Sequence, residues 1–228
     1  MKLGIVTDAF NECGLAMIPG ITSGAECEAL AARISSLTHH GAGSRLLLTL
    51  PWCAELAGRL PRIATLQRFL SADAVCVQCT LFDKSADKNW LVSLHQDLSI
   101  PVKRRVVSAE CSRWSEKEGQ VYVQPPVAVL EQLVAIRVHV NECTADNGPL
   151  RVIPGSHAFG RLDARQTEEL RSAHGEVAVP VPRGGTLVMR PLILHASSKA
   201  TAMHPRRVLH FLFGPPKLPC GLEWRWAV

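Results

Sequence analysis

From residue 74 onward, the sequence is dominated by short apolar stretches separated by turn-forming residues. Seven such stretches cover residues 74–82, 91–95, 133–140, 150–153, 176–181, 186–189 and 208–213. Glycine, proline and asparagine punctuate the gaps, for example at residues 147–149, 154–156 and 182–185. Several short strands with turn signals between them are typical of a β-sandwich or barrel.

The first 70 residues have a different pattern. Ser23 and Glu26 form a capping box, which satisfies the first free amides of a helix, and the apolar spacing predicts that this helix continues through residues 27–37. A polar loop follows at residues 38–44, and two further helices are expected at residues 52–60 and 62–69. We therefore predict a mainly β fold flanked by an N-terminal helical layer of about residues 1–70.

Length and composition favour one domain. The chain has 228 residues, of which 47% are hydrophobic and 20% charged, so it can bury a full core and residues 1–228 are expected to form a single domain. It has no apolar run of about 18 residues, the length that a membrane span needs. Residues 1–9 lack an apolar targeting segment, so we expect a cytoplasmic protein with no membrane partner.

Charge and cysteine content exclude other classes. The net charge is +5, but apart from Lys103, Arg104 and Arg105 the basic residues are dispersed, so we expect no nucleic-acid partner. The eight cysteines lack the spacing of a disulfide framework. Cys76 and Cys79 form one C-x-x-C pair within an expected strand, where residues three apart point to opposite faces. We interpret these cysteines as small buried apolar residues.

The stretch from about residue 98 to 126 has no clear periodicity. It contains two adjacent prolines, a charged middle and an isolated tryptophan. Loops of this length without regular structure are uncommon unless they are functional. We expect a lid loop.

His95, Gln96 and Asp97 close one of the expected strands. Residues two apart on an extended chain share a face, so the imidazole and the carboxylate point to one place. His195, which follows a strongly apolar run, is a candidate third ligand from a distant strand. Two histidines and one carboxylate form the facial triad of non-haem iron, which leaves coordination positions open. A surface pair and a structural histidine are the alternatives.

Arg206 and Arg207 begin the last expected strand, 11 residues or more after His195. An arginine there can hold a carboxylate through two parallel hydrogen bonds while the metal holds the other end of the same molecule. Without the triad, a solvated basic pair is the simpler interpretation.

These residues occur in the order seen in a known family. Leu81 to Lys84, Asn89-Trp90, the H-x-D motif, Asn147-Gly148-Pro149-Leu150 and Pro154-Gly155-Ser156-His157 precede His195 and Arg206. In this arrangement the chain resembles, over nearly its whole length, the phytanoyl-CoA dioxygenase family of iron(II)- and 2-oxoglutarate-dependent oxygenases.

The resemblance implies a double-stranded β-helix (a cupin-like jelly roll) and a set of roles. His95, Asp97 and His195 would bind Fe(II), and Arg206 would bind the distal carboxylate of 2-oxoglutarate. Ser197 and Gln78 stand where relatives contact cosubstrate or substrate. The reaction would consume O2, release succinate and CO2, and hydroxylate a small-molecule substrate; halogenation is not expected, because related halogenases lack the carboxylate that Asp97 supplies.

Arg137 and His139 share one face of their expected strand, while Ile136, Val138 and Val140 take the other. The polar pair faces either solvent or the mouth of the jelly roll. Several relatives carry an aromatic residue where Arg137 stands. If Arg137, His139 and the cluster of Lys103 to Arg105 converge on the pocket, they favour an anionic substrate. The alternative for Arg137 is that it binds the proximal carboxylate of 2-oxoglutarate.

Two other functions fit the same residues. One is a cupin-like binding protein that has lost the reaction, and the other is a metal-dependent hydrolase that uses the same triad. Retention of Arg206 beside the triad argues against both.

Overall fold

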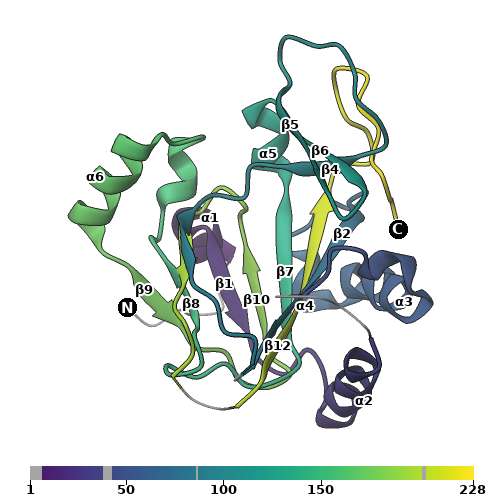
Figure 1. Cartoon of the computed structure of the whole chain (residues 1–228), viewed down its shortest axis with the longest axis vertical. Helices are drawn as coiled ribbons and strands as arrows, with labels where there is room; N and C mark the ends of the chain where they lie inside the picture. The colour runs from purple at the N-terminus through teal and green to yellow at the C-terminus, as the bar shows by residue number, and fades with distance from the viewer. Residues whose placement is uncertain (1–6, 38–42, 86, 202–203) are drawn as a thin grey trace.

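Two antiparallel sheets face each other in the computed structural model, which describes residues 7–37, 43–85, 87–201 and 204–228 (Figure 1). The five-stranded sheet has the order β1 (Leu15–Ile18), β10 (Thr186–Met189), β7 (Val134–His139), β12 (Arg206–Gly214) and β2 (Val75–Lys84). The four-stranded sheet has the order β3 (Val92–His95), β11 (His195–Ser197), β8 (Leu150–Val152) and β9 (Val177–Val179). The expected jelly roll with flanking helices is confirmed.

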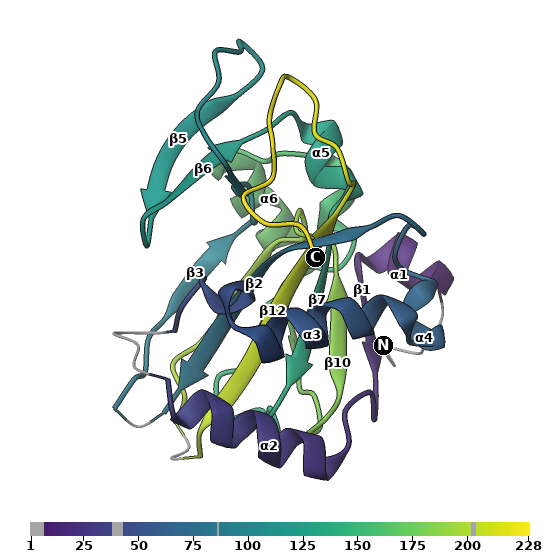
Figure 2. The same cartoon turned by 90° about the vertical axis from the view of Figure 1, so that its right-hand side faces the viewer.

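Helices cover the outer face of the five-stranded sheet, as Figure 2 shows for α2 and α3. The helical layer consists of α1 (Thr7–Cys13), α2 (Gly24–Ser35), α3 (Pro51–Arg59), α4 (Ala64–Gln67) and short 3-10 turns at Leu47–Thr49 and Leu60–Arg62. Ser23 and Glu26 make the predicted capping box of α2. The expected loop at residues 38–44 lies partly outside the described residues, as do residues 1–6 of the targeting-signal analysis.

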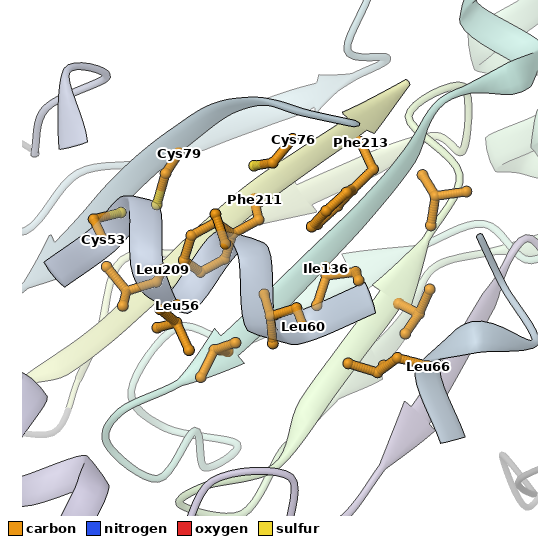
Figure 3. Close-up of a cluster of buried hydrophobic side chains, with 14 of the residues drawn as sticks. Cys53, Leu56, Leu60, Leu66, Cys76, Cys79, Ile136, Leu209, Phe211 and Phe213 are labelled. Atoms are coloured by element: carbon orange, nitrogen blue, oxygen red, sulfur yellow. The ribbon is translucent and has the colours of Figure 1, made fainter. Parts of the chain in front are cut away.

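The outer core joins these helices to the sheet. Leu56 and Leu60 pack against Phe211 and Ile136, and all four side chains are buried (Figure 3). Burial of large apolar side chains supplies most of the favourable free energy of folding. The helical layer and the sheet therefore share one hydrophobic core.

Strand alternation separates apolar from polar residues on β12. Leu209, Phe211 and Phe213 belong to the outer core, whereas Arg206 and His210 take the opposite face, inside the jelly roll. Side chains also alternate between the two faces of β7, where Ile136 and Val138 face the helices. Arg137 and His139 consequently lie buried inside the barrel, and the solvent-facing alternative is excluded.

The expectation that Cys76 and Cys79 face opposite ways is wrong. Leu212 of β12 pairs with Gln78 and Phe213 pairs with Cys76, so β2 has one extra residue at Val77. This bulge shifts the alternation by one residue. Both cysteines therefore enter the outer core as buried apolar side chains, near Cys53 (Figure 3).

The stretch expected to be an irregular lid loop is folded. It forms a third sheet of order β4 (Ile100–Val102), β6 (Gln120–Gln124) and β5 (Ser112–Lys117), followed by α5 (Val127–Gln132). Glu118 and Gly119 make a two-residue hairpin loop in which both have positive φ, as a type I′ turn requires. The charged strand β5 lacks an apolar face, which explains why no periodicity marks it.

Two further elements were not expected. The turn at Ser156–Phe159 is a short 3-10 helix, and α6 (Ala164–His174) follows it beside the four-stranded sheet (Figure 1). Asp163 and Gln166 cap α6, but none of its residues is buried, so no apolar stripe marks it. Within the described part of the chain, every helix is too short or too polar to cross a membrane.

Candidate metal centre

The H-x-D motif and His195 meet at one place. His95 at the end of β3 is the antiparallel partner of His195 on β11, and their ring centroids lie 4.3 Å apart. Nε2 of His95 lies 3.7 Å from Oδ1 of Asp97, and Nε2 of His195 lies 3.7 Å from Oδ2. One donor atom from each residue falls within 4.8 Å of the others. The predicted constellation therefore forms, although no described residue supplies a fourth donor to the group.

Both imidazoles are oriented to offer a lone pair to this point. His95 Nδ1 lies 2.8 Å from the Ser93 carbonyl, and His195 Nδ1 lies 2.9 Å from the Ile193 carbonyl. A carbonyl oxygen only accepts, so each Nδ1 carries the proton and each Nε2 is free to bind a metal. These two hydrogen bonds to backbone carbonyls fit a metal bound through two Nε2 atoms and one carboxylate.

Gln96 holds the motif in place. Its side chain points away from Asp97, as expected, and donates to the carbonyls of Gly160 and Leu192 while accepting from the Leu162 amide. Neither of its polar ends is left free, so the residue between the two ligands cannot rotate without losing three hydrogen bonds.

The three donors differ in exposure. The side chain of His195 is 6% exposed, whereas those of His95 and Asp97 are 41% and 42% exposed. Burial lowers the pKa of His195 to about 4. Burial opposes ionisation of Asp97, but His195 and His95 hold the pKa of its carboxyl well below the usual range. The site is therefore closed on the β11 side and open towards a pocket, with an ionised carboxylate and a neutral His195.

Arg206 and Ser197 lie deeper in the barrel. Ser197 is two residues beyond His195 on β11, about 7 Å along an extended strand. Arg206 is 3% exposed, and its Nε has no hydrogen-bond partner among the described residues. Arg207 points the other way and pairs with Asp83 at 3.3 Å. A buried guanidinium with an unpaired donor matches the chemistry of a missing carboxylate.

Arg137 lies beside the metal centre. Its Nη1 is 2.8 Å from Nδ1 of His210, and its guanidinium carbon is 5.1 Å from the centroid of Phe82. Burial and the Arg137 charge lower the pKa of His210 to about 3, so the imidazole is neutral and accepts from the guanidinium. His139 is buried with both ring nitrogens unpartnered, and burial with the Arg137 charge holds its pKa well below the usual range.

The open side of the centre is a polar cavity of about 290 Å³. Gln78 lines it, donating to Thr80 at 2.7 Å and accepting from the Tyr122 hydroxyl at 3.1 Å. The hairpin β5–β6 supplies Tyr122 and Lys117, and Lys117 Nζ lies 4.8 Å from the Tyr122 ring centroid. Sequence reasoning missed both residues because it expected an irregular loop here.

The basic cluster in this region does not reach the cavity. Lys103 and Arg104 pair with Glu223 of the C-terminal segment at 3.2 and 3.3 Å, and Arg105 stacks on Trp114. None of the three lines the cavity. The hypothesis that they form part of a positive funnel is wrong for this cluster, because a tail 120 residues away in sequence supplies the acid that neutralises it.

Comparison with known proteins is consistent with this geometry. The sequence profile described as phytanoyl-CoA dioxygenase (PhyH) matches residues 10–208. None of the curated proteins shows significant sequence similarity to the chain.

Solved structures share the fold. The apoform of EctD from S. alaskensis superposes with a TM-score of 0.70 and 21% identity, over 100% of this chain and 85% of that one. SnoK, a non-heme alpha-ketoglutarate-dependent carbocyclase from nogalamycin biosynthesis, superposes with a TM-score of 0.67 and 16% identity, over 94% of this chain and 87% of that one. HygX from Streptomyces hygroscopicus, with iron bound, superposes with a TM-score of 0.64 and 18% identity, over 91% of this chain and 85% of that one.

Replacing a single ligand tests the metal centre. We expect Asp97→Ala and His195→Ala each to bind Fe(II) far more weakly in anaerobic calorimetric titrations, because two ligands remain where three converge. His174→Ala, on the exposed face of α6, is the control and should bind like wild type. Full iron affinity in folded Asp97→Ala protein would contradict the assignment.

Proposed function

Because the chain belongs to the phytanoyl-CoA dioxygenase family, we propose that it is a non-haem iron(II)- and 2-oxoglutarate-dependent dioxygenase that hydroxylates a small anionic molecule. His95, Asp97 and His195 bind the iron, and Arg206 binds the distal carboxylate of 2-oxoglutarate. The observation that carries the proposal is that an open three-donor centre and a buried guanidinium, with which no described carboxylate pairs and whose Nε has no hydrogen-bond partner among the described residues, occur inside the same barrel.

The spacing of these groups supports one cosubstrate that spans both. Ser197 is two residues beyond His195 on β11, and Arg206 is buried inside the same barrel. A five-carbon dicarboxylate can place its keto acid end at the metal and its other carboxylate at Arg206. Two solved structures of the same fold contain 2-oxoglutarate: EctD with 2-oxoglutarate and 5-hydroxyectoine, and HygX with nickel and 2-oxoglutarate.

The bound iron supplies the redox chemistry that couples decarboxylation of 2-oxoglutarate, to succinate and CO2, with oxidation of the substrate. The chain's own residues provide geometry. The two imidazoles and Asp97 would hold the metal, and the side towards the cavity would stay open to cosubstrate and O2. Asp97 supplies the carboxylate that related halogenases lack, which favours hydroxylation over halogenation.

Cavity charge supports an anionic substrate. Lys117 is half-buried at the wall of the cavity, and no described carboxylate forms an ion pair with it. Arg137 lies next to the centre, where it contacts His210. No described carboxylate forms an ion pair with it. Arg137 does not line the cavity itself but lies behind His210, which does. Together, Lys117 at the wall and Arg137 behind it attract a carboxylate or phosphate group. We assign Lys117 and Arg137 to substrate binding and place His139 behind them.

The other two functions explain less. A hydrolase with this triad has no use for Arg206, and a binding protein without catalysis does not need an open face at the metal. Neither accounts for a buried guanidinium lacking an acid.

Product analysis tests the function. We expect the Fe(II)-loaded protein, screened with small substrates, to form succinate from 2-oxoglutarate in air and none under anaerobic conditions. Formation of succinate without O2, or its absence in air with every substrate class while iron and 2-oxoglutarate both bind, would contradict a dioxygenase.

The two adjacent arginines offer an internal control. Arg206→Ala removes a charged double hydrogen bond and should weaken 2-oxoglutarate binding by at least about 1.5–3 kcal/mol, or roughly ten- to a hundredfold. Arg207→Ala removes the mostly buried pair with Asp83, on the opposite face of β12, and should bind 2-oxoglutarate like wild type. A larger loss in Arg207→Ala would mean that the inward and outward residues of β12 are exchanged.

Substrate charge is tested separately. With a substrate found in the screen, Lys117→Met should raise the KM for the anionic form and leave the KM for 2-oxoglutarate unchanged. Arg137→Ala should consume 2-oxoglutarate without forming hydroxylated product. Equal turnover of neutral and anionic analogues by wild type, with both variants unaffected, would refute anion recognition.

A further inference from the structure

Lys84 is the last residue of β2 and is buried inside the jelly roll. Its side chain is 1% exposed, and it is the antiparallel partner of Arg206 on β12. The ammonium group donates to Ser197 Oγ at 2.9 Å and to the carbonyl of Ser198. Nothing in the proposed function uses this residue, although it touches Ser197 and neighbours Arg206.

The two neighbouring cations lack an acid. No described carboxylate forms an ion pair with Lys84 or with Arg206. The groups that face them from other elements are Arg151 of β8, the Cys143 thiol and His139 of β7. Burying one charge without a counterion costs several kcal/mol, and two adjacent like charges add to that cost. Burial and the Arg206 charge lower the pKa of Lys84 to about 8, which is the expected response to a missing anion.

We propose that Lys84 is a second cation for the distal carboxylate of 2-oxoglutarate, so that Nζ binds one carboxylate oxygen while Arg206 binds the other. The inference rests on the proposed function and adds a cosubstrate-binding residue to it. Nζ has three protons, of which two are used by Ser197 and the Ser198 carbonyl, and Ser197 in turn donates to the Gly148 carbonyl. The third proton of Nζ is available for a carboxylate that also contacts Arg206.

A purely structural role is the alternative. Lys84 Nζ lies 5.2 Å from the ring centroid of Trp90, so the lysine could serve only to tie β2 to the segment after β11. A neutral hydroxyl or amide can make the same two hydrogen bonds without burying a charge. A bound anionic ligand would balance the charge of Lys84. A purely structural role gives no reason for a charged group at this position.

Binding measurements with two ligands separate the alternatives. 2-Oxoglutarate and 2-oxobutyrate share the keto acid end, but 2-oxobutyrate lacks the distal carboxylate. Both are titrated anaerobically into iron-loaded wild type, Lys84→Met and the control Lys199→Met, whose lysine is exposed. Calorimetry gives each affinity without requiring turnover.

We expect Lys84→Met to bind 2-oxoglutarate about ten- to a hundredfold more weakly, which is the effect of losing a hydrogen bond to a charged group. Its affinity for 2-oxobutyrate should be unchanged, and Lys199→Met should match wild type with both. Unchanged 2-oxoglutarate binding in Lys84→Met, or an equal loss for both ligands, would overturn the proposal. Failure of wild type to bind 2-oxoglutarate at all would instead overturn the proposed function.

Wild-type protein provides a test that does not depend on folding of the variant. As the pH rises from about 7 to about 10, Lys84 loses its proton, so the ratio of 2-oxoglutarate to 2-oxobutyrate affinity should fall. Burial holds the pKa of His139 well below this range and raises the pKa of Cys143. Burial lowers the pKa of Arg137 to about 10, which is the upper end of the range. A ratio independent of pH would overturn the proposal.

Discussion

Charged side chains inside a β-barrel are tolerated here because the other face of the same strands is packed against helices. On β7 and β12, every second residue enters the outer core with α3 and α4, and burial of these apolar residues offsets the cost of placing Arg137 and Arg206 on the inner face. The helical layer therefore does more than cover the sheet: it stabilises strands whose inner faces are devoted to binding.

In the proposed function, the inner face binds the distal carboxylate of the cosubstrate, the metal and the substrate in turn. Lys84, Ser197 and Arg206 are buried inside the barrel, whereas His95 and Asp97 line the cavity. The hairpin β5–β6 supplies the outer wall of the cavity through Lys117 and Tyr122. The proposed cosubstrate and metal sites therefore lie on or next to strands of the two main sheets, and a hairpin contributes to the proposed substrate site.

Strand periodicity made much of the site predictable from sequence. Residues two apart on a strand share a face, which was sufficient to bring His95 to Asp97, to separate Arg206 from Arg207 and to pair Arg137 with His139. Their association with His195 depended on family resemblance, since pairing between distant strands leaves no mark in a single sequence. Lys84 ends one of the family-like segments, Leu81 to Lys84. The sequence does not show that it lies beside Arg206, because this depends on the pairing of β2 with β12.

The failures have local physical causes. One extra residue at Val77 changed the faces of the cysteines, and no residue pattern marks such a bulge. The charged strand β5 and the exposed helix α6 have no apolar face, so periodicity could not detect them, although Asp163 and Gln166 signal the start of α6. The basic residues at 103–105 were misassigned because Glu223 is close only in the folded chain.

In the proposed function, one 2-oxoglutarate molecule spans the barrel from the metal to Arg206. A crystal structure of the protein prepared anaerobically with Fe(II) and 2-oxoglutarate would show whether it does. We expect iron bound to Nε2 of both histidines and to Asp97, with the distal carboxylate against Arg206. Iron bound elsewhere, or 2-oxoglutarate with its distal carboxylate in the outer cavity beside Lys117, would contradict the account.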